Sequence, residues 1–262
     1  MTRNSLRTKS YAPLVAPLQE SFGIRCLDVI GASLGLILTL PLLLVLALLI
    51  KLDSPGPIIY RQRRTGRDRR TTTRDRRRAQ RASARERRRQ EYYGRTFFIY
   101  KFRTMRHNAE RRTGPVWTMP DDPRITKVGR WLRRFHLDEL PQFANVLQGE
   151  MSLVGPRPER PEIIARLVQE LPEYCLRLLV KPGMTGLAQI CQGYDNSIAD
   201  VKRKIHLDLF FATHFSTRLY IRILFLTLVK IFSATPVLEA EFVMPELNAS
   251  TRQHKEQAHE KQ

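Results

Sequence analysis

The sequence predicts an α+β protein that is mainly helical, has short strands, and is anchored to a membrane near its N-terminus. The anchor is indicated by residues 29–50, which carry no charged side chain and are rich in Leu, Ile and Val. Downstream, short strand-like runs alternate with stretches of helical periodicity. Only 42% of the 262 residues are hydrophobic, which suffices for one domain with a core and excludes a polytopic membrane protein.

The apolar segment matches the hydrocarbon core of a bilayer, about 30 Å, if it forms one helix. Pro41 lies near its middle, removes a backbone donor and clashes with the carbonyl of Ile37, so we expect a kink or break there. Basic residues flank both ends. Because positive charge stays on the cytoplasmic side, a re-entrant helix-break-helix with both ends cytoplasmic is favoured, and a kinked spanning helix is the alternative.

Four parts follow from these boundaries. Residues 1–23 form an N-terminal segment, 24–52 the membrane hairpin, 53–248 a globular domain, and 249–262 a polar tail that we expect to be disordered. The domain is interrupted by an arginine-rich insertion at about 68–95. Residues 61–95 hold sixteen arginines and a net charge of +12, and residues 68–90 lack large apolar side chains. We expect a surface insertion that binds anionic lipid, the alternatives being an RNA-binding helix and a solvated linker.

Within the domain, residues 97–100 and 152–154 are strand-like, and residues 125–134, 161–171 and 202–215 are helix-like. Leu219, Ile223, Leu226 and Ile231 recur at helical spacing with basic residues between them. That pattern fits an amphipathic helix at the bilayer interface, and it fits a helix packed on the core equally well. The three cysteines show no Cys-x-x-Cys spacing, which favours a reducing compartment and argues against a zinc site.

Two adjacent carboxylates, Asp138 and Glu139, begin a predicted helix in which Asp138 is a plausible N-cap and Pro141 is tolerated in the first turn. Such a pair is often only a capped surface helix. It can also divide chemical work, with one carboxylate binding a metal or attacking as a nucleophile while the other handles protons.

Isolated cations elsewhere favour the chemical interpretation. Lys101 and Arg103 follow a strand-like run, Arg133 precedes the carboxylates, and Arg157 is held between two prolines in a stiff turn that suits phosphate recognition. The turn at 181–186 has two glycines whose backbone amides can approach an anion. With a membrane segment, this set indicates phosphoryl transfer at the bilayer surface, with cations and a metal neutralising a diphosphate.

Ordered motifs across residues 24–233 resemble those of one protein family. They are Asp28, DSPGPI at 53–58, RQRRTG at 61–66, YKFRTM at 100–105, DPRIT at 122–126, LDELPQ at 137–142, NVL at 145–147, GEMSLVGPRP at 149–158 and KPGMTGLAQ at 181–189. The chain thereby resembles the bacterial sugar transferases, monotopic phosphoglycosyl transferases that start glycan assembly on polyprenyl phosphate.

The resemblance implies an enzyme that transfers a sugar 1-phosphate from a UDP-sugar to undecaprenyl or a similar polyprenyl phosphate and releases UMP. It implies that Asp138 is the nucleophile and contacts Mg²⁺, and that Glu139 assists. Lys101, Arg133 and Arg157 match basic residues at the diphosphate. Arg103, Lys181, Thr185 and Gln189 lie in matched motifs and are expected to contact substrate. The family also implies a catalytic domain on the cytoplasmic face of the inner membrane, a re-entrant helix broken at Pro41, membrane lipids as partners, and no nucleic acid.

Two departures stand out. Phe135 and His136 stand where the family usually has small hydroxylated residues before Leu-Asp-Glu. Residues 68–90 stand where the family usually connects the Arg-x-Gly turn to the next strand through only a few residues. Two rival functions are an Asp138-dependent phosphatase and a membrane-tethered RNA-binding protein that uses the insertion. The sugar, the glycan, the role of His136 and the oligomeric state, a homodimer included, are left open by the sequence.

Overall fold

A computed structural model describes residues 21–68, 93–109, 122–192 and 198–233. Over these residues the chain is mixed helix and strand and mostly helical, as predicted. Most of the N-terminal segment, most of the arginine-rich insertion and the polar tail lie outside the described residues, so the expectations for them stay predictions.

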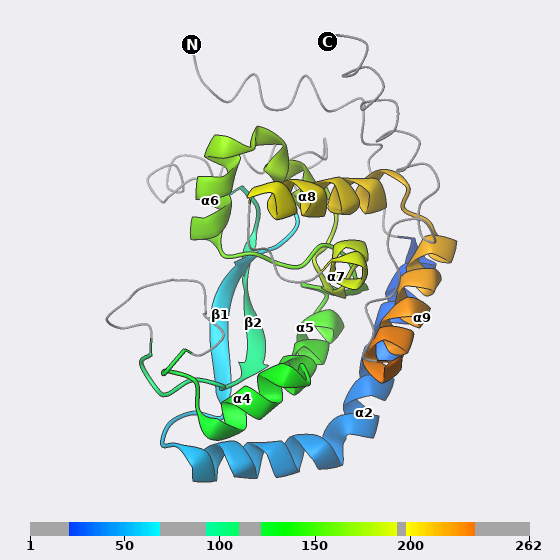
Figure 1. Cartoon of the computed structure of the whole chain (residues 1–262). Coiled ribbons are helices and arrows are strands. Elements are labelled where there is room, and N and C mark those ends of the chain that lie inside the picture. The colour runs from blue at the N-terminus through cyan, green and yellow to red at the C-terminus, as the bar shows by residue number, and fades with distance from the viewer. Residues whose placement is uncertain (1–20, 69–92, 110–121, 193–197, 234–262) are drawn as a thin grey trace, which may run out of the picture.

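The membrane segment forms helix α2, Phe22–Asp53, with Pro41 inside it. Ser21 caps its start by accepting a hydrogen bond from the backbone N–H of Ile24 at 3.3 Å. The sequence left open a kink or a break at Pro41, and the favoured helix-break-helix is corrected, because α2 is one continuous helix through Pro41. Figure 1 shows the axis of α2 changing direction between its two halves, so the helix bends without being interrupted. Thr39 donates to the carbonyl of Gly35 at 2.6 Å, a side-chain bond that favours bending at this place.

Both halves of α2 pack against the same globular body (Figure 1). In the first half, Arg25 donates to the carbonyls of Val146 and Leu147 at 2.7 and 2.8 Å. In the second half, Leu46 and Ile50 are buried in a cluster that includes Phe102, Leu132, Ile58 and Val128. The outer side of α2 exposes a row of apolar side chains, namely Ile30, Leu34, Ile37, Leu38, Leu40, Leu44, Val45 and Leu48. Among the described helices, α2 is long and apolar enough to cross a membrane.

A buried aspartate joins α2 to the core. Asp28, 2% exposed, accepts hydrogen bonds from the Ser152 hydroxyl at 2.9 Å, the Leu153 backbone N–H at 2.7 Å and the Tyr220 hydroxyl at 2.6 Å. These donors come from strand β3, Ser152–Val154, and helix α9, Thr217–Ser233. A buried carboxylate is stable only when hydrogen-bond donors surround it. Because the donors to Asp28 come from β3 and α9, this carboxylate connects α2 to two segments that are distant in the sequence.

Strands β1, Ile59–Thr65, and β2, Thr96–Phe102, form an antiparallel pair, with Thr65 opposite Thr96. The expected strand at 97–100 is confirmed within β2. The partner β1 was not predicted, because its side chains are mostly basic and polar and show no apolar alternation. Gly66 donates to the carbonyl of Arg95 at 2.8 Å, so the arginine-rich insertion begins and ends at the tip of this hairpin.

The remaining helices lie on one side of the hairpin and beyond its tip (Figure 1). The remaining elements are α4, Lys127–Arg134; the 3-10 helix η2, Leu137–Gln142; α5, Phe143–Leu147; α6, Pro161–Glu170; the 3-10 helix η3, Pro172–Leu179; β4, Gly183–Thr185; α7, Leu187–Cys191; and α8, Ile198–Thr213. Strands β3 and β4 pair in parallel. The helices expected near 125–134, 161–171 and 202–215 correspond to α4, α6 and α8.

Helix α9 resolves an ambiguity of the sequence. Its apolar stripe fitted both the bilayer interface and the protein core. Ile223 and Leu226 of this stripe are buried in the main core with Tyr220, so the stripe packs on the protein. The side chain of Ile231 lies outside the described set. A different face of α9 exposes Ile221, Phe225 and Leu228, and this face is available to a lipid surface.

Candidate active site

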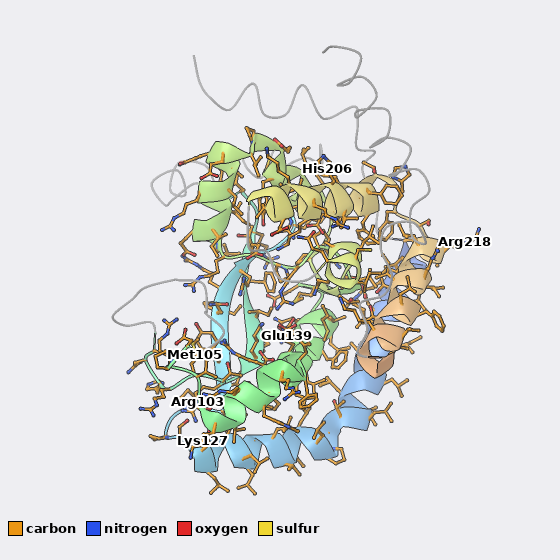
Figure 2. All side chains as sticks on the ribbon, viewed as in Figure 1. Arg103, Met105, Lys127, Glu139, His206 and Arg218 are labelled. Atoms are coloured by element: carbon orange, nitrogen blue, oxygen red, sulfur yellow. The ribbon has the colours of Figure 1, made fainter. Side chains whose placement is uncertain are left out.

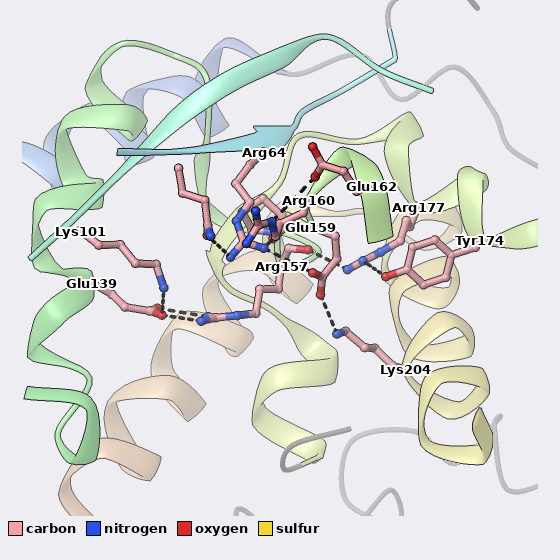
Figure 3. Close-up of polar contacts among 12 residues, drawn as sticks. Arg64, Lys101, Glu139, Arg157, Glu159, Arg160, Glu162, Tyr174, Arg177 and Lys204 are labelled. Atoms are coloured by element: carbon pink, nitrogen blue, oxygen red, sulfur yellow. Dashed lines mark hydrogen bonds and ion pairs between the residues drawn. The ribbon is translucent and has the colours of Figure 1, made fainter. Parts of the chain in front are cut away.

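Glu139 lies between two cations, Lys101 and Arg157, and these three side chains form the cation cluster of the site (Figure 3). Lys101, at the end of β2, donates to Glu139 Oε1 at 2.7 Å. Arg157 makes a two-pronged contact, through Nη1 to Oε2 at 3.1 Å and through Nη2 to Oε1. A guanidinium matches a carboxylate in this paired geometry, so the orientation of Arg157 is fixed as well as its position.

The turn that presents Arg157 is positioned by close backbone packing. It follows β3 and lies against residues 181–183, which lead into β4. A Cβ atom on Gly155 would stand 2.3 Å from the carbonyl oxygen of Lys181, and one on Gly183 would stand 2.0 Å from the backbone nitrogen of Gly155. Only glycine permits this approach. The motif at 181–186, expected to be a turn, instead contains strand β4, Gly183–Thr185, which pairs with β3. The two sequence motifs are therefore one structural unit behind the site.

Asp138 is not a helix N-cap, which corrects the expectation from sequence. The chain turns at His136, a left-handed residue with φ of 55°, and η2 begins at Leu137. Asp138 is consequently inside the 3-10 helix, with its side chain buried at 7% exposure. Among the described residues its carboxylate has no hydrogen-bond or ion-pair partner, in contrast to the neighbouring Glu139.

The two carboxylates are electrostatically unequal. Burial raises the pKa of Asp138 above its ordinary value of 3.8, with Glu139 adding to the rise, although Lys101, Arg133 and Arg157 oppose it. Burial also acts to raise the pKa of Glu139, but the adjacent Arg157 and Lys101 outweigh it and hold that pKa well below 4.5. Glu139 is thus committed as an anion to its two cations, while Asp138 keeps its oxygens free.

Arg133 reaches the same region from α4. Thr126 caps α4 by accepting from the Gly129 backbone N–H at 3.0 Å. A Cβ on Gly129 would stand 2.0 Å from the carbonyl oxygen of Thr104, so α4 lies directly on the chain after β2. Arg133 Nε donates to the Thr104 hydroxyl at 2.9 Å, and its charge partly opposes the rise that burial causes in the pKa of Asp138.

Asn145 has a positioning role that sequence reasoning did not assign. Fully buried, it accepts from the Tyr100 backbone N–H at 3.0 Å and donates to the Phe98 carbonyl at 2.7 Å and to Glu150 at 3.0 Å. It therefore clamps β2 immediately before Lys101. The available signal was its place in the NVL motif shortly after the carboxylates.

Arg103 is engaged away from the carboxylates. It is 5% exposed, and its guanidinium donates to the carbonyls of Ile50 at 3.1 Å, Ser54 at 2.6 Å and Pro55. Figure 2 shows it near the end of α2, apart from Glu139. Arg103 satisfies carbonyls at the C-terminus of α2, where a cation also complements the helix dipole.

Thr185 and Gln189 are likewise not joined to the cation cluster. The Thr185 hydroxyl pairs with that of Thr227 on α9 at 2.8 Å, and the Gln189 amide donates to the Met184 carbonyl at 2.9 Å. Lys181 is half-buried beside the Gly155 turn. Of the residues expected to contact substrate, Lys101, Arg133 and Arg157 gather with Asp138 and Glu139, whereas Arg103, Thr185 and Gln189 lie at other contacts.

The donor set is compatible with Mg²⁺ held mainly by a substrate. The described residues hold no group of three or more His, Cys, Asp or Glu side chains suited to a metal. Asp138 nevertheless offers one buried, unpartnered carboxylate. Because Mg²⁺ is commonly bound through one or two carboxylates together with substrate phosphates, this single ligand fits such an ion.

A buried carboxylate near three cations, in a chain with an exposed apolar helix, is an arrangement that suits phosphate chemistry at a membrane. Comparison with known proteins gives the particular family. The bacterial sugar transferase family matches residues 19–234, and the chain belongs to it.

Three relatives illustrate the match. The chain is 37% identical over 204 residues to a UDP-N-acetylgalactosamine-undecaprenyl-phosphate N-acetylgalactosaminephosphotransferase of Aeromonas hydrophila, covering 78% of this chain and 42% of the relative. It is 38% identical over 210 residues to a UDP-glucose:undecaprenyl-phosphate glucose-1-phosphate transferase of Escherichia coli, covering 79% and 40%. It is 38% identical to the exopolysaccharide production protein PSS of Rhizobium leguminosarum, covering 78% and 92%. The chain thus spans about two fifths of the first two relatives and nearly all of the third.

The inequality of the two carboxylates predicts a titration. Asp138 should titrate above 3.8, because burial and Glu139 disfavour its anion. Glu139→Gln removes the negative neighbour and releases Lys101 and Arg157, and each change favours the Asp138 anion. The pKa of Asp138 should therefore fall in this variant. Carbon-13 NMR of carboxyl-labelled aspartate, assigned with Asp138→Asn, measures it.

The exposed Glu170 supplies the control, since Glu170→Gln should leave the Asp138 titration unchanged. An Asp138 pKa that is ordinary, or that stays constant in Glu139→Gln, contradicts the electrostatic description.

Proposed function

We propose that this chain transfers a sugar 1-phosphate from a UDP-sugar to a polyprenyl phosphate such as undecaprenyl phosphate, releasing UMP and starting the assembly of a glycan. The observation that carries the proposal is the free, buried Asp138 carboxylate beside Lys101, Arg133 and Arg157, in a member of the bacterial sugar transferase family. The names of two relatives, which specify undecaprenyl-phosphate sugar phosphotransfer, support this reaction class.

The first half-reaction is an attack by an Asp138 carboxylate oxygen on the β-phosphorus of the UDP-sugar. A new P–O bond forms, the bond from this phosphorus to the bridging oxygen breaks, and UMP leaves with the bonding electron pair. The product is a phosphosugar held on Asp138 as an acyl phosphate. An aspartate without a competing ion-pair partner suits this step, because its oxygens are not already committed.

In the second half-reaction a phosphate oxygen of the polyprenyl phosphate attacks the same phosphorus. The acyl phosphate bond breaks, Asp138 recovers its carboxylate, and the sugar diphosphate lipid departs. The kinetics are therefore ping-pong. Neither half-reaction requires net proton transfer if the acceptor phosphate is ionised, which suits a site whose second carboxylate, Glu139, is held as an anion.

Lys101, Arg133 and Arg157 stabilise negative charge on the donor diphosphate, and Glu139 orients two of them. Preorganised cations of this kind avoid reorganisation during the reaction, and losing one such electrostatic donor typically costs about 3–4 kcal/mol. Asp138 together with the donor's phosphate oxygens would hold Mg²⁺. When bound, this ion supplies further positive charge to the diphosphate.

We also propose that α2 re-enters the cytoplasmic leaflet of the inner membrane and does not span it. Arg25 and Asp28 near one end of α2, and Ile50 and Asp53 at the other, bond to the same globular body. A helix that crossed the bilayer would place these two ends on opposite sides. The exposed apolar side chains on the outer side of α2 and on α9 supply the surface that lies in lipid.

Release of UMP tests the reaction. Purified chain, Mg²⁺ and a panel of UDP-sugars should yield UMP and a lipid-linked product that appears only with polyprenyl phosphate. Asp138→Asn keeps the shape but loses the nucleophilic charge, so it should abolish both products, while Glu170→Gln retains them. Free sugar phosphate made continuously without lipid identifies a phosphatase instead, and a fully active Asp138→Asn excludes Asp138 as the nucleophile.

Labelling of cysteines tests the topology. In a variant whose three native cysteines are replaced, Ser5→Cys and Pro57→Cys should both react only from the cytoplasmic side, because the two flanks of a re-entrant helix share one side. A known periplasmic cysteine in the same cells verifies the probe. Periplasmic reaction at position 5 alone establishes a spanning helix.

A further inference from the structure

A second buried charge cluster lies behind the active-site turn. Arg177 on η3 is 2% exposed and forms an ion pair with Asp208 on α8 at 2.8 Å. It also donates hydrogen bonds to the Tyr174 hydroxyl at 2.6 Å and to the backbone carbonyl of Arg157 at 2.9 Å. Figure 3 shows Arg177 and Tyr174 on the opposite side of the Arg157 turn from Glu139. No role in the reaction proposed above has been given to these residues.

The Arg157 turn depends on outside donors. Pro156 and Pro158 have no backbone N–H, so the turn can be fixed only weakly through its own amides. It is held instead through its carbonyl oxygens, by Gly183 N on Pro156 at 3.0 Å, Arg177 on Arg157 at 2.9 Å, and Arg64 on Pro158 at 3.0 Å. Of these three bonds, the one from Arg177 is made to Arg157, whose side chain binds Glu139.

Stability alone is a poor reason for burying Arg177 and Asp208. Removing two charges from water costs about as much as their attraction returns, and apolar replacements are often neutral or stabilising. The geometry offers a better reason. A guanidinium has donors in a rigid fork. An arginine whose Nη1 donates to Tyr174 and whose Nη2 is paired with Asp208 therefore holds the Arg157 carbonyl, which Nη2 also bonds, in a set direction.

We infer that Arg177, oriented by Asp208, is a positioning residue that fixes the main chain at Arg157 so that its guanidinium meets the phosphates of the donor. This inference rests on the proposed function. It extends that function to residues that touch neither substrate nor the reacting carboxylates. Arg177 acts through the carbonyl of Arg157, and α8 thereby supports a site to which it contributes no reacting group.

The test compares two variants in the full-length chain. Arg177→Lys keeps the charge beside Asp208 but replaces the fork by a single nitrogen, and it should lower kcat for UMP release by about 10–100-fold, the scale of a displaced reacting group. Val201→Ala removes buried volume from the apolar cluster that includes Tyr174 and leaves the Arg177 donors untouched. It should lower kcat less than about 3-fold at a temperature where both variants are folded.

A double-mutant cycle separates positioning from general damage. If Arg177 acts through Arg157, then Arg177→Lys should cost less than about 3-fold when added to Arg157→Ala, because the group it positions is already gone. Equal losses in the two backgrounds overturn the inference, as does a loss no larger than that of Val201→Ala. An Arg157→Ala variant with full activity also overturns it.

A structural readout keeps the inference separate from the proposed function. Hydrogen–deuterium exchange of the peptide covering residues 155–160 should accelerate in Arg177→Lys and not in Val201→Ala, whether or not the chain releases UMP. If the wild-type chain releases no UMP, the proposed function fails, and unchanged exchange at 155–160 separately refutes positioning by Arg177. Should Arg177→Lys not fold, Asp208→Asn, which keeps one acceptor oxygen, should produce the same changes in smaller measure, and unchanged exchange in it refutes the inference.

Discussion

The sharing of the Glu139 carboxylate between Lys101 and Arg157 is the interaction on which the site depends. These cations come from β2 and from the turn after β3, and neither would lie near the other without an anion between them, because two like charges at such a distance repel strongly in a buried setting. Glu139 offsets one of these two positive charges, and the remaining positive charge favours the anion of Asp138. Asp138 is buried beside the pair and, among the described residues, has no ion-pair partner of its own. The electrostatic difference between the two carboxylates thus follows from charge balance.

The same strand links the site to the membrane segment. Lys101 lies on β2 and Arg103 directly follows this strand. Lys101 binds Glu139, whereas Arg103 binds the carbonyls at the end of α2. Asn145 fixes this strand from the opposite edge. At the other end of α2, Asp28 binds β3, the strand that leads into the Arg157 turn. Each end of α2 is therefore bonded to a residue that lies only a few positions along the chain from one of the two cations, Lys101 or Arg157.

Local pattern was enough to predict the apolar helix and an irregularity in its middle, the strand at 97–100 and the helix containing Arg133. These features depend on hydrophobic runs, proline geometry and period. The basic strand β1 was not predicted, because it forms by pairing with β2 and its own side chains show no strand pattern. Asp138 as an N-cap was wrong because the left-handed turn at His136 sets the start of η2. The sequence motif placed Arg103 beside Lys101 as a substrate contact. Arg103 instead binds three carbonyls near the end of α2, and this contact depends on tertiary packing that the local sequence does not reveal.

The central claim is that Asp138 is the free carboxylate that receives the phosphosugar, and trapping this species tests it most directly. Protein mixed with the correct UDP-sugar and Mg²⁺, without polyprenyl phosphate, should release about one UMP per active site, as expected for covalent catalysis that stalls after its first step. Mass spectrometry should then find a sugar-phosphate adduct on the peptide carrying Asp138, which disappears on addition of polyprenyl phosphate. UMP release that requires lipid, with no adduct on that peptide, would contradict the account and indicate direct transfer between the two substrates.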